Sequence, residues 1–155
     1  IHPRELCIYH NQAMKQQQAY NGIVVDYPYA YLAVDYAGLE VLDISNPSAP
    51  KQLHWYDLWQ VSSGRNFWLG SAGHTNQMAY DAAKKQLFVS AGDSELLVFD
   101  MSKAEQPRLI KQFGEPKDHM GSWGVCLDRN IVYVSYIKAV LPFLSKWNGI
   151  AALSR

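Results

Sequence analysis

The chain has 155 residues, of which 48% are hydrophobic, 18% charged and 13% aromatic. This composition is typical of a globular domain and excludes an intrinsically disordered chain. Fourteen basic residues balance fourteen acidic ones, so we expect neither nucleic acid nor an anionic membrane as a partner. The longest apolar run, residues 137–144, is shorter than the roughly 20 residues of a membrane-spanning helix, and we expect no transmembrane segment.

Short strand-like segments follow one another along the chain, with turn residues between them. In chain order, the expected strands lie at residues 3–9, 22–26, 29–34, 38–43, 51–56, 77–81, 87–90, 95–100, 108–113, 124–128, 131–135 and 149–154. Asp43 and Asp100 each precede a proline by seven residues, so both stretches are expected to be hairpin connections whose closing proline marks the first residue of the next strand. Short, evenly spaced strands with turn signals predict an all-β fold.

The repeat gives the order d, a-b-c-d, a-b-c-d, a-b-c. The b and c segments are apolar on both faces, which favours β-propeller blades stacked on one another over a sandwich with one wet face. We therefore predict a partial β-propeller of four-stranded blades, about three blades in all. Its expected parts are a d strand of a preceding blade at 1–10, blades at 20–57 and 74–114, strands a–c of a further blade at 121–155, and insertions at 58–73 and 137–148.

The segment from Tyr29 to Pro50, YAYLAVDYAGLEVLDISNPSAP, closely resembles the LVIVD-repeat family of β-propeller proteins. The resemblance is looser from Gln77 to Phe113 and partial after Gly121. It implies a propeller of the kind found on exported, cell-surface or periplasmic proteins. It implies no general enzymatic activity, and it assigns no catalytic residues.

About three blades cannot close a ring, because propellers have about four to eight. The chain starts with Ile1 and both ends fall in mid-blade, so we expect a part of a longer protein. Further blades are expected from the same protein or from a second chain. We expect Leu6–Tyr9 and Ile150–Leu153 to pair with strands, either with each other or with a second chain, because open strand edges invite pairing.

The two cysteines are expected to be unbonded. Cys7 falls on an outer d segment and Cys126 on an inner a segment. Even in one blade, three strand spacings would separate them by about 14 Å, whereas a disulfide tolerates a Cα separation of about 7 Å. The redox compartment of the protein is therefore left open.

The two insertions are rich in aromatic residues and belong to connections that a propeller places on one face. We expect them either to pack on each other as a lid or to form a surface for a protein or small-molecule ligand. The candidate binding residues are Trp59, Arg65, Phe67, Trp68, Trp123, Phe143 and Trp147.

Four polar residues fall beside the expected channel mouth, at strand entrances and in a b-to-c turn. His74, Asn76, Asp93 and His119 are of the types that could hold a divalent metal, although no His-x-His or Glu-x-x-His spacing accompanies them. The leading functional hypothesis is a noncatalytic propeller module that presents an aromatic-rich loop face to a partner. The alternatives are a propeller enzyme, a metal-assisted hydrolase or oxidoreductase with its site at the channel mouth, and a purely structural repeat.

Overall fold

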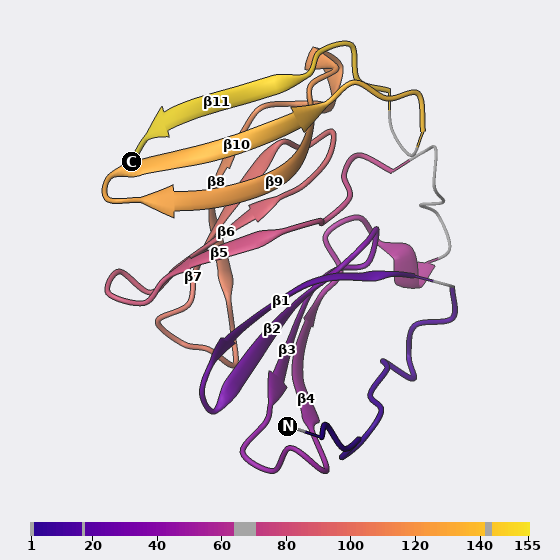
Figure 1. Cartoon of the computed structure of the whole chain (residues 1–155). Coiled ribbons are helices and arrows are strands. Elements are labelled where there is room, and N and C mark those ends of the chain that lie inside the picture. The colour runs from indigo at the N-terminus through magenta and orange to yellow at the C-terminus, as the bar shows by residue number, and fades with distance from the viewer. Residues whose placement is uncertain (1, 17, 64–70, 142–143) are drawn as a thin grey trace.

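The computed structural model describes residues 2–16, 18–63, 71–141 and 144–155 and contains three antiparallel sheets (Figure 1). The first sheet consists of β1 (Tyr20–Asp26), β2 (Tyr29–Val34), β3 (Gly38–Asp43) and β4 (Lys51–Tyr56). The second consists of β5 (Met78–Asp81), β6 (Gln86–Ser90), β7 (Leu96–Asp100) and β8 (Arg108–Phe113). The third consists of β9 (Gly121–Asp128), β10 (Ile131–Ile137) and β11 (Gly149–Ser154). Two short 3-10 turns, η1 (Val61–Ser63) and η3 (Pro116–Asp118), lie in the connections between sheets.

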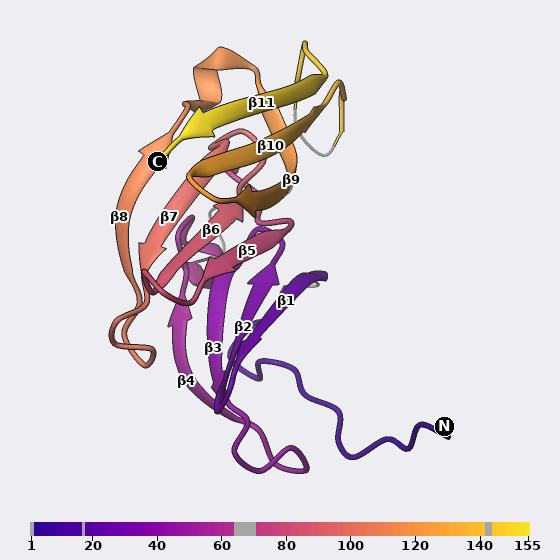
Figure 2. The same ribbon diagram turned by 60° about the vertical axis from the view of Figure 1, so that its left-hand side comes forward.

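Each sheet is a meander in which strands adjacent in sequence are adjacent in space. Inner strands of neighbouring sheets contact one another, β1 with β5 and β5 with β9, so the sheets stack side by side as blades (Figure 2). The fold is all-β, a partial β-propeller, and this confirms the predicted fold class. Among the described residues, the first two blades have four strands and the third has three.

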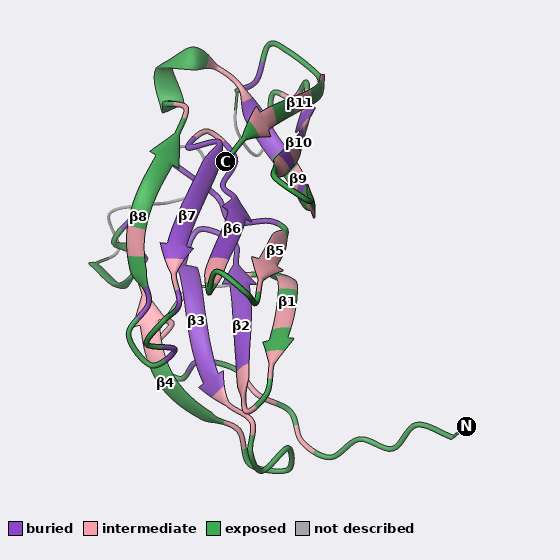
Figure 3. Cartoon of the chain, turned by 90° about the vertical axis from the view of Figure 1, so that its left-hand side faces the viewer, coloured by how far each residue is buried: buried purple, intermediate pink, exposed green. Residues whose placement is uncertain are grey.

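The middle strands of the first two blades are buried on both faces, as their sequences predicted. β2, β3, β6 and β7 are buried over most of their length, whereas β4 and β8 are largely exposed (Figure 3). One apolar cluster, with Tyr31 and Phe99 at its centre, lies between blades 1 and 2. A second, around Phe88 and Val134, lies between blades 2 and 3. Side chains such as Leu, Val and Phe suit these strands because a pleated surface with neighbours on both sides buries them fully.

The two c-to-d connections match each other. After β3, the Asp43 carboxylate accepts a hydrogen bond from the Ser45 amide at 2.8 Å, and after β7 the Asp100 carboxylate accepts one from the Ser102 amide at 2.9 Å. Such local side-chain bonds are typical of turns that begin with Asp. The predicted hairpin connections are confirmed. The next strand starts one residue later than expected, because Pro50 and Pro107 each precede its first residue.

Residues 2–10 form no strand in the structure, contrary to the expectation of a d strand at 1–10. The physical reason is that an outer strand needs the edge of a c strand to complete its hydrogen bonds, and in this structure no c strand lies beside the segment. Cys7 and Cys126 are both free, as predicted, and Cys126 lies on the inner strand β9.

A third apolar cluster, around Leu32 and Leu42, lies on the outer face of blade 1, and Tyr9 and Met14 pack against it.

None of the helices in the described ranges is both long enough and apolar enough to cross a membrane.

Candidate functional site

One face of the molecule carries the connections that enter each blade and the connections between its second and third strands. We call it the loop face; its described parts are residues 35–37, 57–63, 71–77, 91–95, 114–120, 138–141 and 144–148. Because meander strands alternate in direction, these connections come to the same end of the sheets. Of the predicted site residues that the structure describes, Trp59, His74, Asn76, Asp93, His119 and Trp147 belong to this face, and Trp123 lies near the start of β9.

The blades are joined at the loop face by a repeated backbone contact. Asp35, just after β2, forms a bridge with Thr75 at the entrance to blade 2, and Gly92 forms the corresponding bridge with Ser122 at the entrance to blade 3. The Thr75 hydroxyl lies 2.9 Å from the carbonyl oxygens of both Asp35 and Gly38. The Ser122 hydroxyl donates to the Glu95 carbonyl at 2.5 Å. Both residues are fully buried, so each hydroxyl needs the backbone carbonyl that it bonds, because a buried hydroxyl without a partner is costly.

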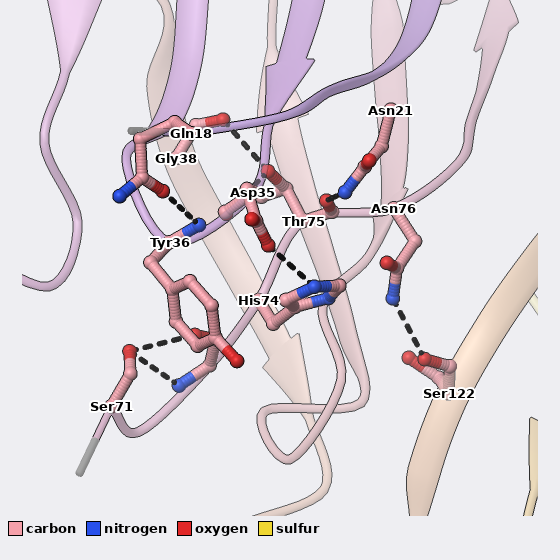
Figure 4. A network of polar contacts seen from close by, with 11 residues as sticks. Gln18, Asn21, Asp35, Tyr36, Gly38, Ser71, His74, Thr75, Asn76 and Ser122 are labelled. Carbon is pink, nitrogen blue, oxygen red and sulfur yellow. Dashed lines mark hydrogen bonds and ion pairs between the residues drawn. The ribbon is translucent and has the colours of Figure 1, made fainter. Parts of the chain in front are cut away.

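A second repeated contact lies one residue away. The Asn21 side-chain amide donates to the Thr75 carbonyl at 2.9 Å, and the Asn76 side-chain amide donates to the Ser122 carbonyl at 3.1 Å (Figure 4). In blade 3 the corresponding position is occupied by Trp123, which is 38% exposed to solvent. Asn21 on β1 and Asn76 just before β5 thus each hold the next blade through a side-chain amide, whereas blade 3 has an indole ring at this position.

His74 forms a buried ion pair with Asp35, with 2.5 Å between Nε2 and Oδ1 (Figure 4). Both side chains are only 7% exposed. The imidazole also stacks on Trp123, with ring centroids 5.9 Å apart, and meets the edge of Tyr36 at 4.9 Å. His74 therefore joins the β2–β3 connection of blade 1 to the first strand of blade 3, across the entrance to blade 2.

Asp93 lies in the β6–β7 connection, and burial raises its pKa to about 6, while the neighbouring imidazoles of His119 and His74 act in the opposite direction. Its Oδ1 atom and the Asn76 Oδ1 atom are buried and have no hydrogen-bond partner among the described residues. His119 adopts the left-handed conformation with φ 53° at the end of η3. Its carbonyl accepts a hydrogen bond from the Lys146 amide at 2.9 Å.

The four predicted metal ligands thus belong to one face. Asp35 and Tyr36, which contact His74 directly, were missed by the sequence analysis, although Asp35 follows a buried strand in a connection that the repeat placed on this face. Within the described ranges, no group of three or more His, Cys, Asp or Glu side chains is arranged to hold one metal ion.

The predicted aromatic residues divide into buried and exposed ones. Trp59 is 8% exposed and packs into the cluster between blades 1 and 2, with its ring against Gly73, where a Cβ would collide with it. Trp147 is 41% exposed and contacts Tyr136 edge to face at 5.2 Å. The remaining candidates, Arg65, Phe67, Trp68 and Phe143, lie outside the described residues.

The β10–β11 connection carries the most exposed apolar side chains of the loop face. Val140 is 78% exposed, Leu141 65% and Leu144 47%. Ala139 and Ser145 exchange backbone hydrogen bonds of 3.2 and 2.9 Å across the loop, and the Ser145 hydroxyl accepts one from the Gly121 amide. An open groove of about 540 Å³ lies along this connection, lined by Lys138, Ala139, Val140, Leu144, Ser145 and Lys146.

Comparison with solved structures finds 11 similar chains, among them two of unrelated description. The crystal structure of the computationally designed Ika4 protein is 11% identical, with a TM-score of 0.44 and 99% coverage of both chains. A chain in the crystal structure of a mitotic checkpoint complex is 11% identical, with a TM-score of 0.42, and the match covers 89% of this chain and 41% of that one. No curated protein matches the chain.

The family comparison agrees with the repeat found in the sequence. The model of the LVIVD repeat matches residues 21–57, a range that contains all but the first residue of the β1–β4 sheet. The first blade of this partial propeller is therefore similar to the LVIVD repeat.

Proposed function

We propose that the chain is a noncatalytic β-propeller repeat module that binds a partner with its loop face, and that the partner is a protein segment with apolar side chains. The observation that carries the proposal is the exposure of Val140, Leu141 and Leu144 in one connection. Corresponding connections in the other blades, residues 35–37 and 91–95, are short and largely buried. Contiguous exposed apolar residues on a rigid scaffold are typical of binding surfaces.

The surroundings of this connection support a binding role. Trp123 and Trp147 each expose about two-fifths of their residue surface on the same blade, and tryptophan is among the residues most enriched at binding hot spots. Lys138 and Lys146 border the groove, which gives the apolar centre a polar rim, as protein interfaces commonly have.

The buried polar cluster supports a structural role for His74 and Asp35. Both side chains are almost fully enclosed, and their ion pair joins two blades. A pair that holds the base of the loop face would keep the neighbouring loops in fixed positions, which reduces the ordering cost of binding.

The test uses random peptides displayed on phage and selected on the immobilised 155-residue chain. Selected peptides are then synthesised and titrated against the wild type, a Leu141→Ser/Leu144→Ser double variant, and a Leu53→Ser variant. Leu53 is an exposed leucine on the outer strand β4, so it controls for a general loss of surface apolarity.

We expect the double variant to bind selected peptides about tenfold more weakly or worse, since each leucine buried at an interface contributes on the order of 1 kcal/mol or more. The Leu53→Ser variant should bind like the wild type. Peptides that bind the double variant as tightly as the wild type would contradict the proposal, as would the failure of the selection to enrich any peptide.

A further inference from the structure

The third blade has an open edge where the other two blades have a fourth strand. In blade 1, β3 pairs with β4, and in blade 2, β7 pairs with β8. β11 occupies the corresponding position in blade 3, and among the described residues it pairs on one side alone, with β10. Beside it runs an apolar groove of about 520 Å³, lined by Phe88, Val98, Ile110, Phe113 and Leu153, among others. An exposed strand edge next to an apolar groove is suited to accept an added strand.

The chain itself contains a segment with the pattern of a fourth strand. β4 and β8, each with its preceding proline, read PKQLHWY at 50–56 and PRLIKQF at 107–113, and residues 3–9 read PRELCIY. All three have proline, then a basic residue, an aliphatic residue at the fourth position and an aromatic residue at the seventh. The first two form the fourth strand of a blade, so the third is expected to form one as soon as a c-strand edge is available.

The structure holds this segment away from the β11 edge of its own chain. The Tyr9 hydroxyl donates to the buried carboxylate of Glu40 in blade 1 at 2.9 Å, and the Asn11 side chain donates to the same carboxylate at 3.1 Å. Both views of the chain show residues 2–10 leaving blade 1 on the side opposite to β11 (Figures 1 and 2). Leu6 is 50% exposed and Ile8 is 80% exposed.

We propose that residues 3–9 of one copy add to β11 of a second copy as the fourth strand of its third blade. β4 and β8 pair with their neighbours in one common register: Asp43 with Lys51 and Asp100 with Arg108 at one end, Leu39 with Tyr56 and Leu96 with Phe113 at the other. Both ladders shift by one residue at the same place. The same register places Ser154 opposite Arg4, Ala152 opposite Cys7, Ala151 opposite Ile8 and Ile150 opposite Tyr9.

This register places the apolar side chains consistently. Ala151 and Leu153 pack on the cluster between blades 2 and 3, so Ile8, opposite Ala151, points to the same side and enters the groove beside Phe113. Tyr9 points to the other side, where its hydroxyl can keep the bond to Glu40 of its own copy. One strand can therefore complete the blade of one copy while it stays anchored to the other.

The added strand brings two open blade faces together. Ile23 and Val25 are exposed on β1, and Ile150 is exposed on β11; in the assembly, blade 3 of one copy lies beside blade 1 of the other. This contact is head to tail, so it closes only if the rotations complete a ring. Two copies of three blades make six, which lies within the usual range of about four to eight for propellers.

The test of the register is a disulfide. In a Cys126→Ser background, Ala152→Cys places a thiol opposite the natural Cys7 of the other copy, and directly opposite residues lie about 4.5–5.5 Å apart, within the range of a disulfide. Mild oxidation of the 155-residue chain should give a covalent dimer on a non-reducing gel. Ala151→Cys is the matched control, because its side chain points to the opposite face of the strand from Cys7 and should cross-link at least tenfold less.

The test of the assembly is sedimentation equilibrium. The wild type should be a dimer at micromolar concentrations, and Ile8→Asp should be a monomer with an unchanged circular dichroism spectrum, since Ile8 is exposed in the single chain. The control is Val140→Asp, at a residue that is 78% exposed and thus nearly as exposed as Ile8 at 80%. This variant should remain dimeric. The proposal would be overturned if the wild type were a monomer or if the dimer survived Ile8→Asp. It would also be overturned if the Ala151→Cys variant cross-linked equally, or if the cross-link formed only within single chains.

Discussion

Asp93 is expected to destabilise the folded protein at neutral pH, and its replacement by asparagine should relieve that cost. The side chain lies partly buried in the β6–β7 connection, and burial raises its pKa from the ordinary 3.8 to about 6. A difference of about 2 pH units corresponds to about 3 kcal/mol at 1.36 kcal/mol per pH unit. Because the side chain is partly open to solvent, screening reduces the expected effect to about 1–2 kcal/mol.

The sign follows from which state binds the proton more tightly. Because the pKa of Asp93 is higher in the folded protein, the folded state holds the proton where the unfolded chain has already lost it. Below pH 3.8 the carboxyl is neutral in both states and costs nothing. Stability is lost as the pH rises from 3.8 to about 6, and the full cost remains above that range.

The free energy of unfolding should therefore differ between Asp93→Asn and the wild type in a pH-dependent way. The difference should be close to zero near pH 4 and should reach about 1–2 kcal/mol in favour of the variant above pH 7. Urea denaturation followed by tryptophan fluorescence, at one protein concentration and with a chelator present, measures it from about pH 3.5 to about pH 8. Asp118→Asn, at an exposed carboxylate of η3, serves as the control. A variant no more stable than the wild type at pH 8, or a pH-independent difference, would refute the reasoning.

Two further substitutions test the contacts that join the blades. The Tyr136 hydroxyl donates to the buried carboxylate of Glu95 at 2.8 Å; Tyr136→Phe should lower the free energy of unfolding by about 1.5–3 kcal/mol in urea denaturation, whereas Tyr133→Phe in the same strand should change it little. Thr75→Val, which removes the buried hydroxyl between Asp35 and Gly38, should cost about 1–3 kcal/mol by the same measurement. Thr75→Ser should retain most of that stability, and equal losses in the two Thr75 variants would show that the hydroxyl is not the cause.

The strands and hairpins could be predicted because their signals are local. The apolar run at 38–43, the Asp43 turn and the proline at 50 specify a strand, a connection and a second strand within 20 residues, and each ladder forms between neighbours in sequence. Burial on both faces of the b and c strands was visible in their composition. The same local pattern at residues 3–9 predicted a strand that the structure lacks, because a strand forms only against a partner edge.

The candidate site was only partly predictable, because its contacts join residues far apart in the chain. His74 was recognised as a polar residue at a strand entrance, but its pairing with Asp35, 39 positions earlier, and its stacking on Trp123, 49 positions later, depend on how three blades stack. The aromatic residues show the same limit: Trp59 is buried and Trp147 is exposed, although both occur in aromatic insertions. The sequence by itself determined the repeat, the strands and the face to which the loops belong, since these depend on neighbours along the chain. The tertiary structure alone decided which side chains meet and which remain open to a partner, because burial and contact depend on segments that the sequence keeps far apart.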